Sequence, residues 1–246
     1  MENQFQSGER ESDDLLRVRN LSKHFGEIKA LDSITFDIRK HEIVGLIGPN
    51  GAGKTTLLEG MTGLMPLDRG EIFREDTLLP VSRRRRTMFY LPDCIIPYPE
   101  LPVGKAIDFW ARFLGAEQEK FTEIIQRLEL ETVQFKRINS LSKGYRRRFL
   151  LAISLLSSQS LLILDEPFDG LDLRQMLTII AILKETRAAG RTLLLSIHQL
   201  YDAERICDRF LLLNAGRMLG FGTLPELRKQ AGLSAGNLED VFLALT

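Results

Sequence analysis

The sequence predicts an α/β fold with a parallel central sheet, an N-terminal antiparallel β-subdomain and an inserted α-helical subdomain. Two observations support this prediction. Short runs of β-branched and apolar residues alternate with stretches whose apolar residues recur at helical spacing, which is typical of a parallel sheet covered by helices. Before about residue 73, strand-like runs follow one another with only short turns between them, which predicts an antiparallel sheet beside the central one.

The N-terminal part of the chain is expected to hold a tail and a series of strands. The first residues, MENQFQSGERESDD, are polar and aperiodic, so we expect a flexible tail at 1–14 and one folded domain at 15–246. Strand-like runs follow at LLRVRNL, SITFDIR, EIVGLIG, GEIF and RTMFYLP. The basic run SRRRR, with Arg83 to Arg86, is expected on a surface turn, either as a solvated face or as a contact with acidic lipid or a partner.

The middle of the chain changes character at about residue 93. Helical spacing in VGKAIDFWARFLG, EKFTEIIQRLEL and YRRRFLLAISLLSS predicts the helical subdomain at about 93–160. After it, LLILDEP and RTLLLSIH are expected to be strands, with a helix and a glycine stop in RQMLTIIAILKETRAAG between them. The remaining elements are a short helix in YDAERIC, two strands around the Asn-Ala-Gly turn of RFLLLNAGRMLGFG, and a helix in LEDVFLALT.

Composition argues against several classes of protein. Lys plus Arg and Asp plus Glu both number 33, and a formal net charge of zero argues against a general nucleic-acid binder. The two cysteines, Cys94 and Cys207, suit a reducing cytoplasm without a disulfide framework. No stretch approaches the roughly 18 apolar residues of a membrane span and no signal peptide is visible, so a membrane role is expected to come through a partner.

The stretch GLIGPNGAGKTTLLEG predicts a phosphate-binding loop. Gly48 to Thr55 fits the pattern G-x-x-x-x-G-K-T between a buried strand and a helix that begins at Lys54. Glycines let backbone N–H groups approach phosphate oxygens, and the helix N-terminus adds partial positive charge. Lys54 is suited to reach the β- and γ-phosphates, and Thr55 is suited to hold Mg²⁺. The alternative is a plain glycine turn between strand and helix.

Two adjacent carboxylates follow the apolar run LLILDEP. Asp165 and Glu166 are expected at the C-terminal end of a buried strand, which is where α/β sheets bind ligands. Asp165 is suited to hold Mg²⁺ through water, and Glu166 is suited to polarise an attacking water. The alternative role for this pair is to cap a helix.

A second anion site is predicted in NSLSKGYRRR. Ser142 and Gly144 are expected to begin a helix, whose N-terminal N–H groups attract anions. The alternative is a helix cap followed by a basic first turn. Arginines in the first turn oppose the helix dipole, however, so a cap alone leaves the arginine cluster unexplained.

With these motifs, the chain resembles the nucleotide-binding subunit of an ABC transporter, and it is most similar to the ATPases of ABC-2-type exporters. The resemblance extends from about Leu16 to the C-terminus. The family elements occur in order: phosphate loop GPNGAGKT, signature LSKGY, Walker B LLILDE, D-loop DGLD and switch histidine in SIHQ. GTPases and kinases lack the LSKGY element. The resemblance implies a P-loop NTPase core that hydrolyses ATP, with ATP and Mg²⁺ as cofactors.

The resemblance also implies a head-to-tail dimer, with ATP between the phosphate loop of one subunit and the signature segment of the other. The residues implied in ATP binding are Phe25, Gly48, Pro49, Asn50, Gly51, Ala52, Gly53, Lys54, Thr55 and Thr56. Those implied to contact ATP in trans are the signature residues Leu141, Ser142, Lys143, Gly144 and Tyr145. Asp172 is the implied D-loop residue. Catalysis is implied for Glu166, His198 and Lys54, and metal binding for Thr55, Asp165 and Asp93.

Three of these assignments depend mainly on position in the family pattern. Phe25 matches the aromatic residue that stacks on adenine, although an aromatic there also suits a core. His198 would contact the γ-phosphate near Glu166, although a lone histidine after a strand is otherwise structural. Asp93 stands where the family usually has glutamine. Its charge suits a hard cation, but it is one methylene shorter and would need closer approach or a bridging water; a loop cap is the alternative.

Further departures from the family pattern bear on turnover and symmetry. The signature carries Lys143 and Tyr145 in place of the commoner L-S-G-G-Q, and Phe168 replaces a small polar residue after Walker B. None of these changes removes a chemical group that hydrolysis requires.

The predicted function is therefore ATP hydrolysis that powers substrate movement through a separate membrane subunit. The tail LEDVFLALT resembles those of ABC-2-type exporter ATPases and favours export. The expected partners are a second ABC ATPase subunit, identical or different, and an integral membrane permease, which would hold the chain on the cytoplasmic face of the membrane; no nucleic acid is expected. The alternatives are a soluble non-transport ABC ATPase and a low-turnover regulatory subunit. The first usually has two modules or a long coiled-coil insert, and neither is seen in this sequence. Glu166 and His198 argue against the second, whereas Asp93 leaves it open.

Overall fold

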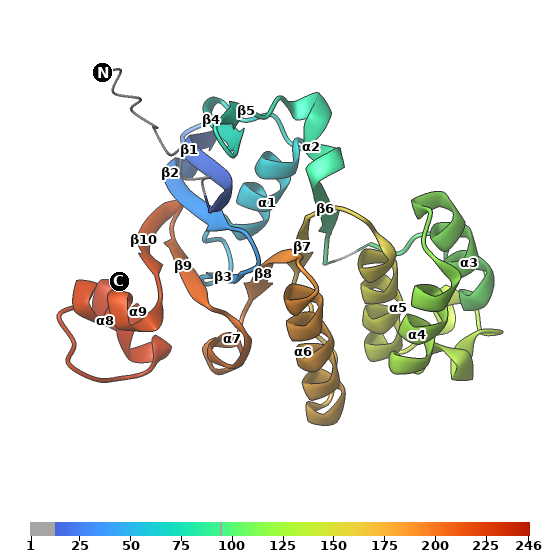
Figure 1. Ribbon diagram of the computed structural model, residues 1–246. Helices are drawn as coiled ribbons and strands as arrows, with labels where there is room; N and C mark the ends of the chain where they lie inside the picture. The colour runs from blue at the N-terminus through green and yellow to red at the C-terminus, as the bar shows by residue number, and fades with distance from the viewer. Residues whose placement is uncertain (1–12, 94) are drawn as a thin grey trace, which may run out of the picture.

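The computed structural model describes residues 13–93 and 95–246, which form two sheets surrounded by helices (Figure 1). The strands are β1 Asp14–Phe25, β2 Ile28–Arg39, β3 Ile43–Ile47, β4 Arg69–Arg74, β5 Thr77–Leu78, β6 Met88–Leu91, β7 Leu161–Asp165, β8 Thr192–Ile197, β9 Arg209–Asn214 and β10 Arg217–Gly222. The α-helices are α1 Lys54–Thr62, α2 Val81–Thr87, α3 Val103–Leu114, α4 Gln118–Arg127, α5 Lys143–Leu156, α6 Leu173–Ala188, α7 Leu200–Ile206, α8 Leu224–Gln230 and α9 Leu238–Leu245. Two 3₁₀ turns, η1 Leu130–Val133 and η2 Ile138–Ser140, lie between α4 and α5.

The two sheets have the predicted topologies. The central sheet has six strands in the order β10-β9-β3-β8-β7-β6, and all of its pairs are parallel except β10 with β9. The second sheet, in the order β2-β1-β4-β5, is antiparallel and lies over the central sheet on the side of α1. The α/β fold class is therefore confirmed, with both sheets where the sequence predicts them.

The central strands are buried on both faces, which explains their continuous apolar sequences. Along β7, Leu161 and Ile163 belong to the apolar core shared with α1 and the antiparallel sheet. Leu162 and Leu164 point the opposite way, into the core shared with α5 and α6. Side chains on successive strand residues alternate between the two faces, so one apolar strand contributes to both cores.

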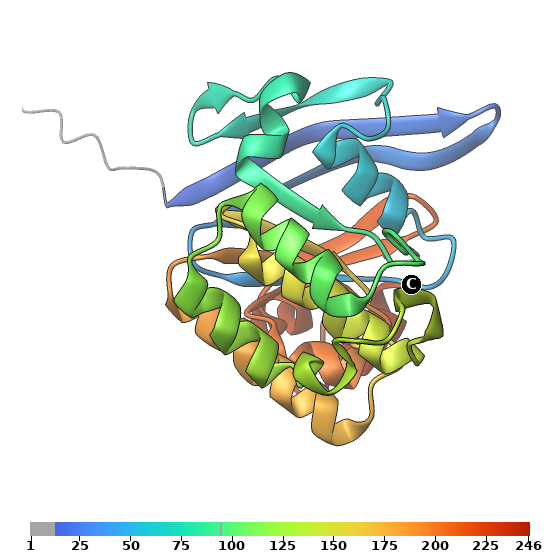
Figure 2. The same ribbon diagram turned by 90° about the vertical axis from the view of Figure 1, so that its right-hand side faces the viewer.

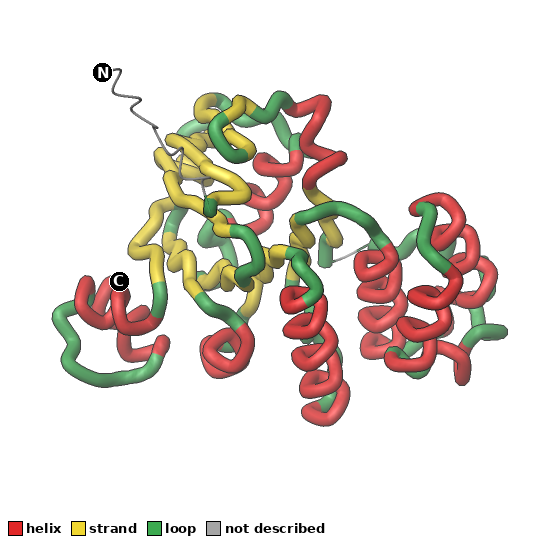
Figure 3. Tube along the Cα trace, in the orientation of Figure 1, coloured by secondary structure: helices red, strands yellow, loops and turns green. Residues whose placement is uncertain are grey.

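Helices α3, α4 and α5 form a group at one end of the molecule, with no strand among them (Figure 3). They pack on one another through an apolar face that includes Val103, Ile107, Ile124 and Leu151. Figure 2 views this group from its outer side, with the antiparallel sheet above it. The group lies within the predicted helical subdomain, whose boundaries at about 93 and 160 remain a prediction.

At the N-terminus, β1 begins at Asp14, one residue before the predicted start of the folded domain. The rest of the predicted tail, residues 1–12, lies outside the described residues, and residue 13 precedes β1 without regular structure. Within the described part of the chain, no helix has both the length and the apolar character needed to cross a membrane.

The basic run at Arg83 to Arg86 differs from its prediction as a surface turn. It lies in α2, and Arg84 is 7% exposed. The Arg84 guanidinium donates hydrogen bonds to the carbonyls of Gly60 and Met61, at 2.9 and 3.3 Å from Nη1, at the C-terminal end of α1. A cation is favourable there because the last carbonyls of a helix are unpaired and carry partial negative charge. Arg84 is thus a structural cap, and the rest of the run is exposed.

Candidate nucleotide site

The candidate site lies where parallel strands of the central sheet end. Strand β3 ends at Ile47 and leads into the glycine loop, and β7 ends at Asp165. The neighbouring strand β8 ends at Ile197, immediately before His198, and β6 ends two residues before Asp93. Because these strands are parallel, their carboxyl ends meet at one edge of the sheet, and segments far apart in the sequence come together there.

The backbone of the loop before α1 requires glycine at two positions in particular. Gly53 has φ of +101°, and a Cβ there would lie 2.4 Å from the carbonyl oxygen of Ala30. A Cβ on Gly48 would lie 2.2 Å from the carbonyl oxygen of Leu213. Glycine therefore lets the loop pack against two neighbouring segments while its N–H groups remain available at the N-terminus of α1.

Lys54 is the first residue of α1 and folds back over the loop. Its Nζ donates hydrogen bonds to the carbonyl oxygens of Gly48 and Pro49, at 2.8 and 3.2 Å. Burial lowers the pKa of Lys54, while Glu166 and Asp165 oppose that shift. An ammonium group held by carbonyl oxygens beside two carboxylates provides a cation of fixed position inside the loop.

Asp165 lies at the centre of a group of oxygen atoms. Its Oδ2 lies 3.3 Å from Thr55 Oγ1 and 3.5 Å from the hydroxyl of Tyr90, and the residue is 4% exposed. Burial, followed by the charge of Asp165, raises the pKa of Tyr90, so this hydroxyl stays protonated. A hydroxyl and a carboxylate oxygen are donors of the type that Mg²⁺ prefers. Among the described residues, no group of three or more His, Cys, Asp or Glu side chains is arranged to hold a metal ion.

Glu166 follows Asp165 in a left-handed backbone conformation, with φ of +51°. This conformation is uncommon for a residue other than glycine, and strand β8 secures it. The N–H of Glu166 donates to the carbonyl of Ser196 at 3.1 Å, and Ser196 Oγ donates to Glu166 Oε1 at 3.4 Å. His198 Nε2 lies 3.5 Å from the same carboxylate oxygen.

The electrostatic environment of Glu166 favours proton acceptance near neutral pH. Burial raises its pKa to about 7; the charge of Lys54 opposes this rise and that of Asp165 adds to it. A carboxylate with this pKa is ionised in a large fraction of molecules at neutral pH and is still basic enough to accept a proton. Neither Asp165 nor Glu166 caps a helix, because the next helix, α6, takes its cap from Asp172.

A cleft of ≈ 630 Å³ joins most of the predicted nucleotide residues. Of the predicted set it is lined by Phe25, Pro49, Asn50, Gly51, Gly53, Lys54, Thr55, Thr56, Asp93, Asp165, Glu166 and His198. Gly48 and Ala52 do not line it and instead shape the loop from behind. Phe25 is at the end of β1, 49% exposed, with Lys23 Nζ 5.3 Å from the centre of its ring. One face of the cleft thus offers an aromatic ring, and the other offers the glycine loop.

The signature segment is separate from this cleft. None of Leu141 to Tyr145 is among the described residues that line it. Ser142 is the N-cap of α5, and its Oγ accepts a hydrogen bond from the N–H of Tyr145 at 3.4 Å. A Cβ on Gly144 would lie 2.9 Å from the carbonyl oxygen of Gly170, so glycine permits close contact between the signature and the D-loop.

The D-loop is held by the signature residue Lys143, whose Nζ lies 2.6 Å from Asp169. Asp172 caps α6 in a capping box with Gln175. Within a single chain the structure therefore brings the signature and D-loop together, but keeps the signature apart from the glycine loop.

The structure also reveals residues that the sequence analysis missed. Tyr90 and Ser196 contact Asp165 and Glu166, but each is a single polar residue inside an apolar strand and carries no motif. Arg147 donates to the carbonyl of Asp165 at 3.2 Å and forms an ion pair with Asp93. The basic cluster after the signature was the one available signal for Arg147, because a cap alone did not explain it.

Comparisons with known proteins match the chain to ATP-binding proteins of ABC transporters. The family model described as ABC transporter matches residues 31–169. The chain is 33% identical over 238 residues to the ABC-type transporter ATP-binding protein EcsA of Bacillus subtilis, covering 94% of this chain and 96% of EcsA. It is 31% identical over 221 residues to the lipopolysaccharide export system ATP-binding protein LptB of Escherichia coli K12, covering 86% of this chain and 92% of LptB.

A solved structure of the ATP-binding subunit of an ABC transporter has the same fold. Its TM-score is 0.84 at 33% identity, over 94% of this chain and 99% of that chain. The fold, the order of the motifs and these similarities all agree. The chain belongs to the ABC transporter family, as one of its ATP-binding, ATP-hydrolysing subunits.

Proposed function

We propose that this chain is the ATPase subunit of an exporter, with ATP bound in the cleft at the ends of β3, β7 and β8. The convergence of Lys54, Asp165 and Glu166 at that edge is the observation that carries the proposal. In this assignment Phe25 stacks on the adenine ring, and the loop from Gly48 to Thr56 surrounds the phosphates. An aromatic face and a ring of backbone N–H groups suit the two ends of a nucleotide.

Hydrolysis is assigned to the residues around Glu166. The carboxylate of Glu166 accepts a proton from the attacking water, and the raised pKa of about 7 makes it a suitable base. His198 lies beside that carboxylate and is placed to contact the γ-phosphate, while Lys54 balances charge on the β- and γ-phosphates. Thr55, Asp165 and Asp93 line the cleft and would hold Mg²⁺, which would supply charge neutralisation on the phosphate oxygens.

A second ABC ATPase subunit is required in this proposal. The signature residues Leu141 to Tyr145 lie outside the cleft of their own chain, with the N-terminus of α5 capped only at Ser142. Placed against the cleft of another subunit, Ser142 and Gly144 would present N–H groups and a hydroxyl to the γ-phosphate. Asp172 and its neighbours in the D-loop would lie at the same contact because the D-loop packs on the signature.

The membrane partner is proposed to dock on the aromatic surface formed by Tyr98, Phe109, Trp110 and Phe113. Tyr98 and Phe109 are 5.7 Å apart between ring centres, Phe109 stacks on Phe113 at 6.2 Å, and Trp110 meets Phe113 edge-on at 5.7 Å. Tyr98, Phe109 and Phe113 are 49%, 46% and 71% exposed. Contiguous exposed aromatic side chains are typical of a protein interface. An integral membrane permease docked there would hold the chain at the cytoplasmic face of the membrane.

Export is favoured by the similarity to LptB, which is named for an export system, and by the C-terminal helix α9. Two other functions remain as alternatives: a non-transport ABC ATPase, and a regulatory subunit with low turnover. The contiguous exposed aromatic side chains on α3 favour a subunit with a docked partner over a non-transport ATPase. The presence of both Glu166 and His198 favours a hydrolysing subunit over a regulatory subunit with low turnover.

The experiment that tests the proposal is purification of the tagged chain from detergent-solubilised membranes, followed by an ATPase assay. We expect a membrane protein to co-purify and ATP hydrolysis that Glu166→Gln abolishes. Phe109→Asp with Phe113→Asp should release the membrane protein. Phe135→Asp is the matched control, because Phe135 is 88% exposed in the same helical group but outside the aromatic surface. An active chain that never associates with a membrane protein would support the non-transport alternative.

A further inference from the structure

Arg147 is a buried cation that joins three segments of the nucleotide site. It lies in the second turn of α5, and its side chain is 4% exposed. Nη1 donates to the carbonyl oxygen of Asp165 at 3.2 Å, and Nη2 pairs with the carboxylate of Asp93. The residue therefore links the helix that begins at the signature, the end of β7 and the loop that follows β6.

The adjacent Arg148 is a buried arginine of the same helix whose hydrogen-bond partners do not line the nucleotide cleft. Its side chain is 5% exposed, and its Nη1 lies 2.7 Å from Glu129 and 3.1 Å from the carbonyl of Leu128. Each guanidinium thus contacts one carboxylate and one carbonyl, and that of Arg148 also lies 4.0 Å from the ring centre of Tyr145. The contacts of Arg148 stay among the helices, whereas those of Arg147 reach the residues that line the cleft.

Asp93 lines three hollows, two of which bear on its contact with Arg147. It lines the nucleotide cleft together with Thr55, Asp165 and Glu166. It also lines a hollow of ≈ 240 Å³ with Ile95, Ile96, Arg146 and Arg147, on the side of α5. Its side chain is 33% exposed, so the carboxylate has room to move if it is released.

Because of the charges in the cleft, the position of the Asp93 carboxylate depends on Arg147. Asp93, Asp165 and Glu166 all line the cleft, and the charges of Asp165 and Asp93 both raise the pKa of Glu166, so these acids repel one another. A guanidinium that contacts both the Asp93 carboxylate and the Asp165 carbonyl offsets that repulsion and fixes the distance between the two segments. Without it, the Asp93 carboxylate would face the other two acids of the cleft without this compensating charge.

We propose that Arg147 is a positioning residue of the nucleotide site, which holds Asp93 beside Thr55 and Asp165 and thereby sets how strongly Mg²⁺ strengthens nucleotide binding. This inference rests on the proposed function, because it assumes a Mg²⁺–nucleotide complex in the cleft. Arg147 itself contacts neither nucleotide nor metal. It acts through Asp93, in the way that outer partners orient metal ligands.

The test is the Mg²⁺ linkage of nucleotide binding, defined as the ratio of the Kd values without and with Mg²⁺. A non-hydrolysable ATP analogue is titrated into the full chain by calorimetry, in EDTA and in excess Mg²⁺. We expect Arg147→Gln and Asp93→Asn each to reduce the linkage by about tenfold. The double variant should lose no more than either single variant, because both changes break one arrangement. Arg147→Lys should restore part of the linkage.

The matched control is Arg148→Gln, which removes a buried arginine from the same helix. It is expected to lower the melting temperature as Arg147→Gln does, and to leave the Mg²⁺ linkage unchanged. Asp93→Asn is nearly isosteric and keeps the measurement possible if Arg147→Gln does not fold. An unchanged linkage in Asp93→Asn, or fully additive losses in the double variant, would overturn the inference. Absence of analogue binding by the unmodified chain would instead overturn the proposed function.

Discussion

Replacement of Glu166 by Gln is expected to stabilise the folded chain, because the site holds this carboxylate in an unfavourable environment. Burial raises the pKa of Glu166 from 4.5 to about 7, and its side chain is 16% exposed. A difference of about 2.5 pKa units between the folded and unfolded states corresponds to about 3 kcal/mol. Gln keeps the shape of the side chain and has no charge to bury, so the variant does not lose this free energy of unfolding.

The sign of the pH dependence follows from the raised pKa. Well below pH 4.5 the carboxyl is protonated in both the folded and the unfolded state, so its burial does not lower the free energy of unfolding. Between pH 4.5 and about 7 the unfolded state ionises first, so stability is lost as pH rises. The stability advantage of Glu166→Gln should therefore be about 3 kcal/mol at pH 8 and fall below about 1 kcal/mol at pH 5.

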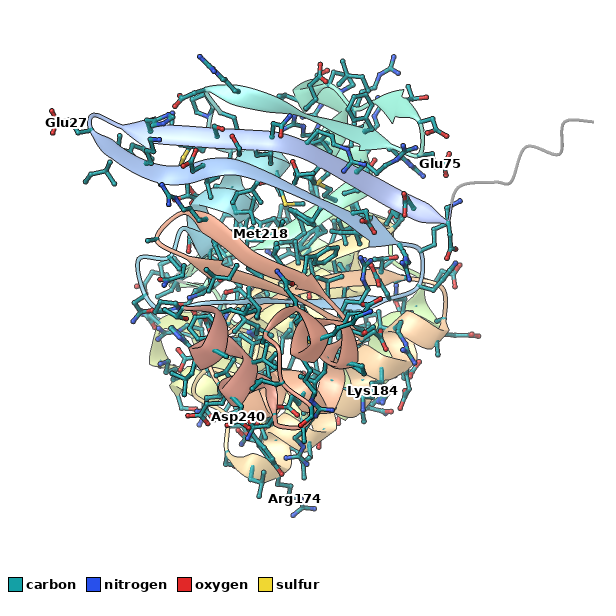
Figure 4. The ribbon with its side chains drawn as sticks, turned by 90° about the vertical axis from the view of Figure 1, so that its left-hand side faces the viewer. Glu27, Glu75, Arg174, Lys184, Met218 and Asp240 are labelled. Carbon is teal, nitrogen blue, oxygen red and sulfur yellow. The ribbon has the colours of Figure 1, made fainter. Side chains whose placement is uncertain are left out.

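The assay is urea denaturation of both proteins at several pH values between 5 and 8. Glu27→Gln is the control, because Glu27 lies at the tip of the β1–β2 hairpin, far from the central sheet (Figure 4). This control should show no comparable change in stability with pH. The stability advantage of Glu166→Gln could instead stay constant over this range, or the variant could be less stable than the unmodified chain at pH 8. Either result would show that folding does not raise the pKa of the Glu166 carboxyl as described.

Three further substitutions test separate parts of the structure. Arg84→Ala should lower the free energy of unfolding by about 2–3 kcal/mol because it leaves the carbonyls at the end of α1 unpaired, while Arg85→Ala, at an exposed position, should change it by less than about 0.5 kcal/mol; thermal denaturation measures both. Phe25→Ala should weaken ATP binding by about tenfold and Phe25→Tyr should preserve it, as measured by fluorescence titration, and equal affinities would exclude stacking. Gly48→Ala should abolish ATP binding, since its Cβ would lie 2.2 Å from the Leu213 carbonyl; normal affinity in the calorimeter would show that the loop tolerates a side chain.

Much of the fold could be predicted because local sequence signals and tertiary structure agree. Continuous apolar runs such as that of β7 are buried on both faces, and the glycine loop separates a strand from a helix as its residues require. Helix α2 was not predicted, because its run of arginines was interpreted as a surface turn. The role of Arg84 could not be read from the sequence either, because the α1 carbonyl that it contacts belongs to Gly60, which is distant in sequence. Helix α8 was missed entirely; of its residues Leu227 alone is buried, so its sequence carries no apolar repeat.

The candidate site was predictable to the extent that its residues form contiguous motifs. Lys54, Asp165 and Glu166 belong to such motifs, and they line one cleft. Ser196 and Arg147 do not, since their roles arise from strand pairing and helix packing that join segments far apart in the chain. The pairing of Asp93 with Arg147 is likewise a property of the assembled fold, and it changes how the replacement of glutamine by Asp93 is interpreted.

In the proposed arrangement the ATP site is completed by two subunits, with the signature of one subunit closing the cleft of the other. Light scattering on the Glu166→Gln protein with Mg²⁺, before and after addition of ATP, tests this most directly. If two copies of this chain form the pair, we expect ATP to double the mass, and we expect the added substitution Ser142→Arg to prevent the doubling without preventing ATP binding. A doubling that survives Ser142→Arg would contradict this arrangement. A mass that remains that of a single chain with ATP bound would exclude two copies of this chain and leave a different ABC ATPase as the second subunit.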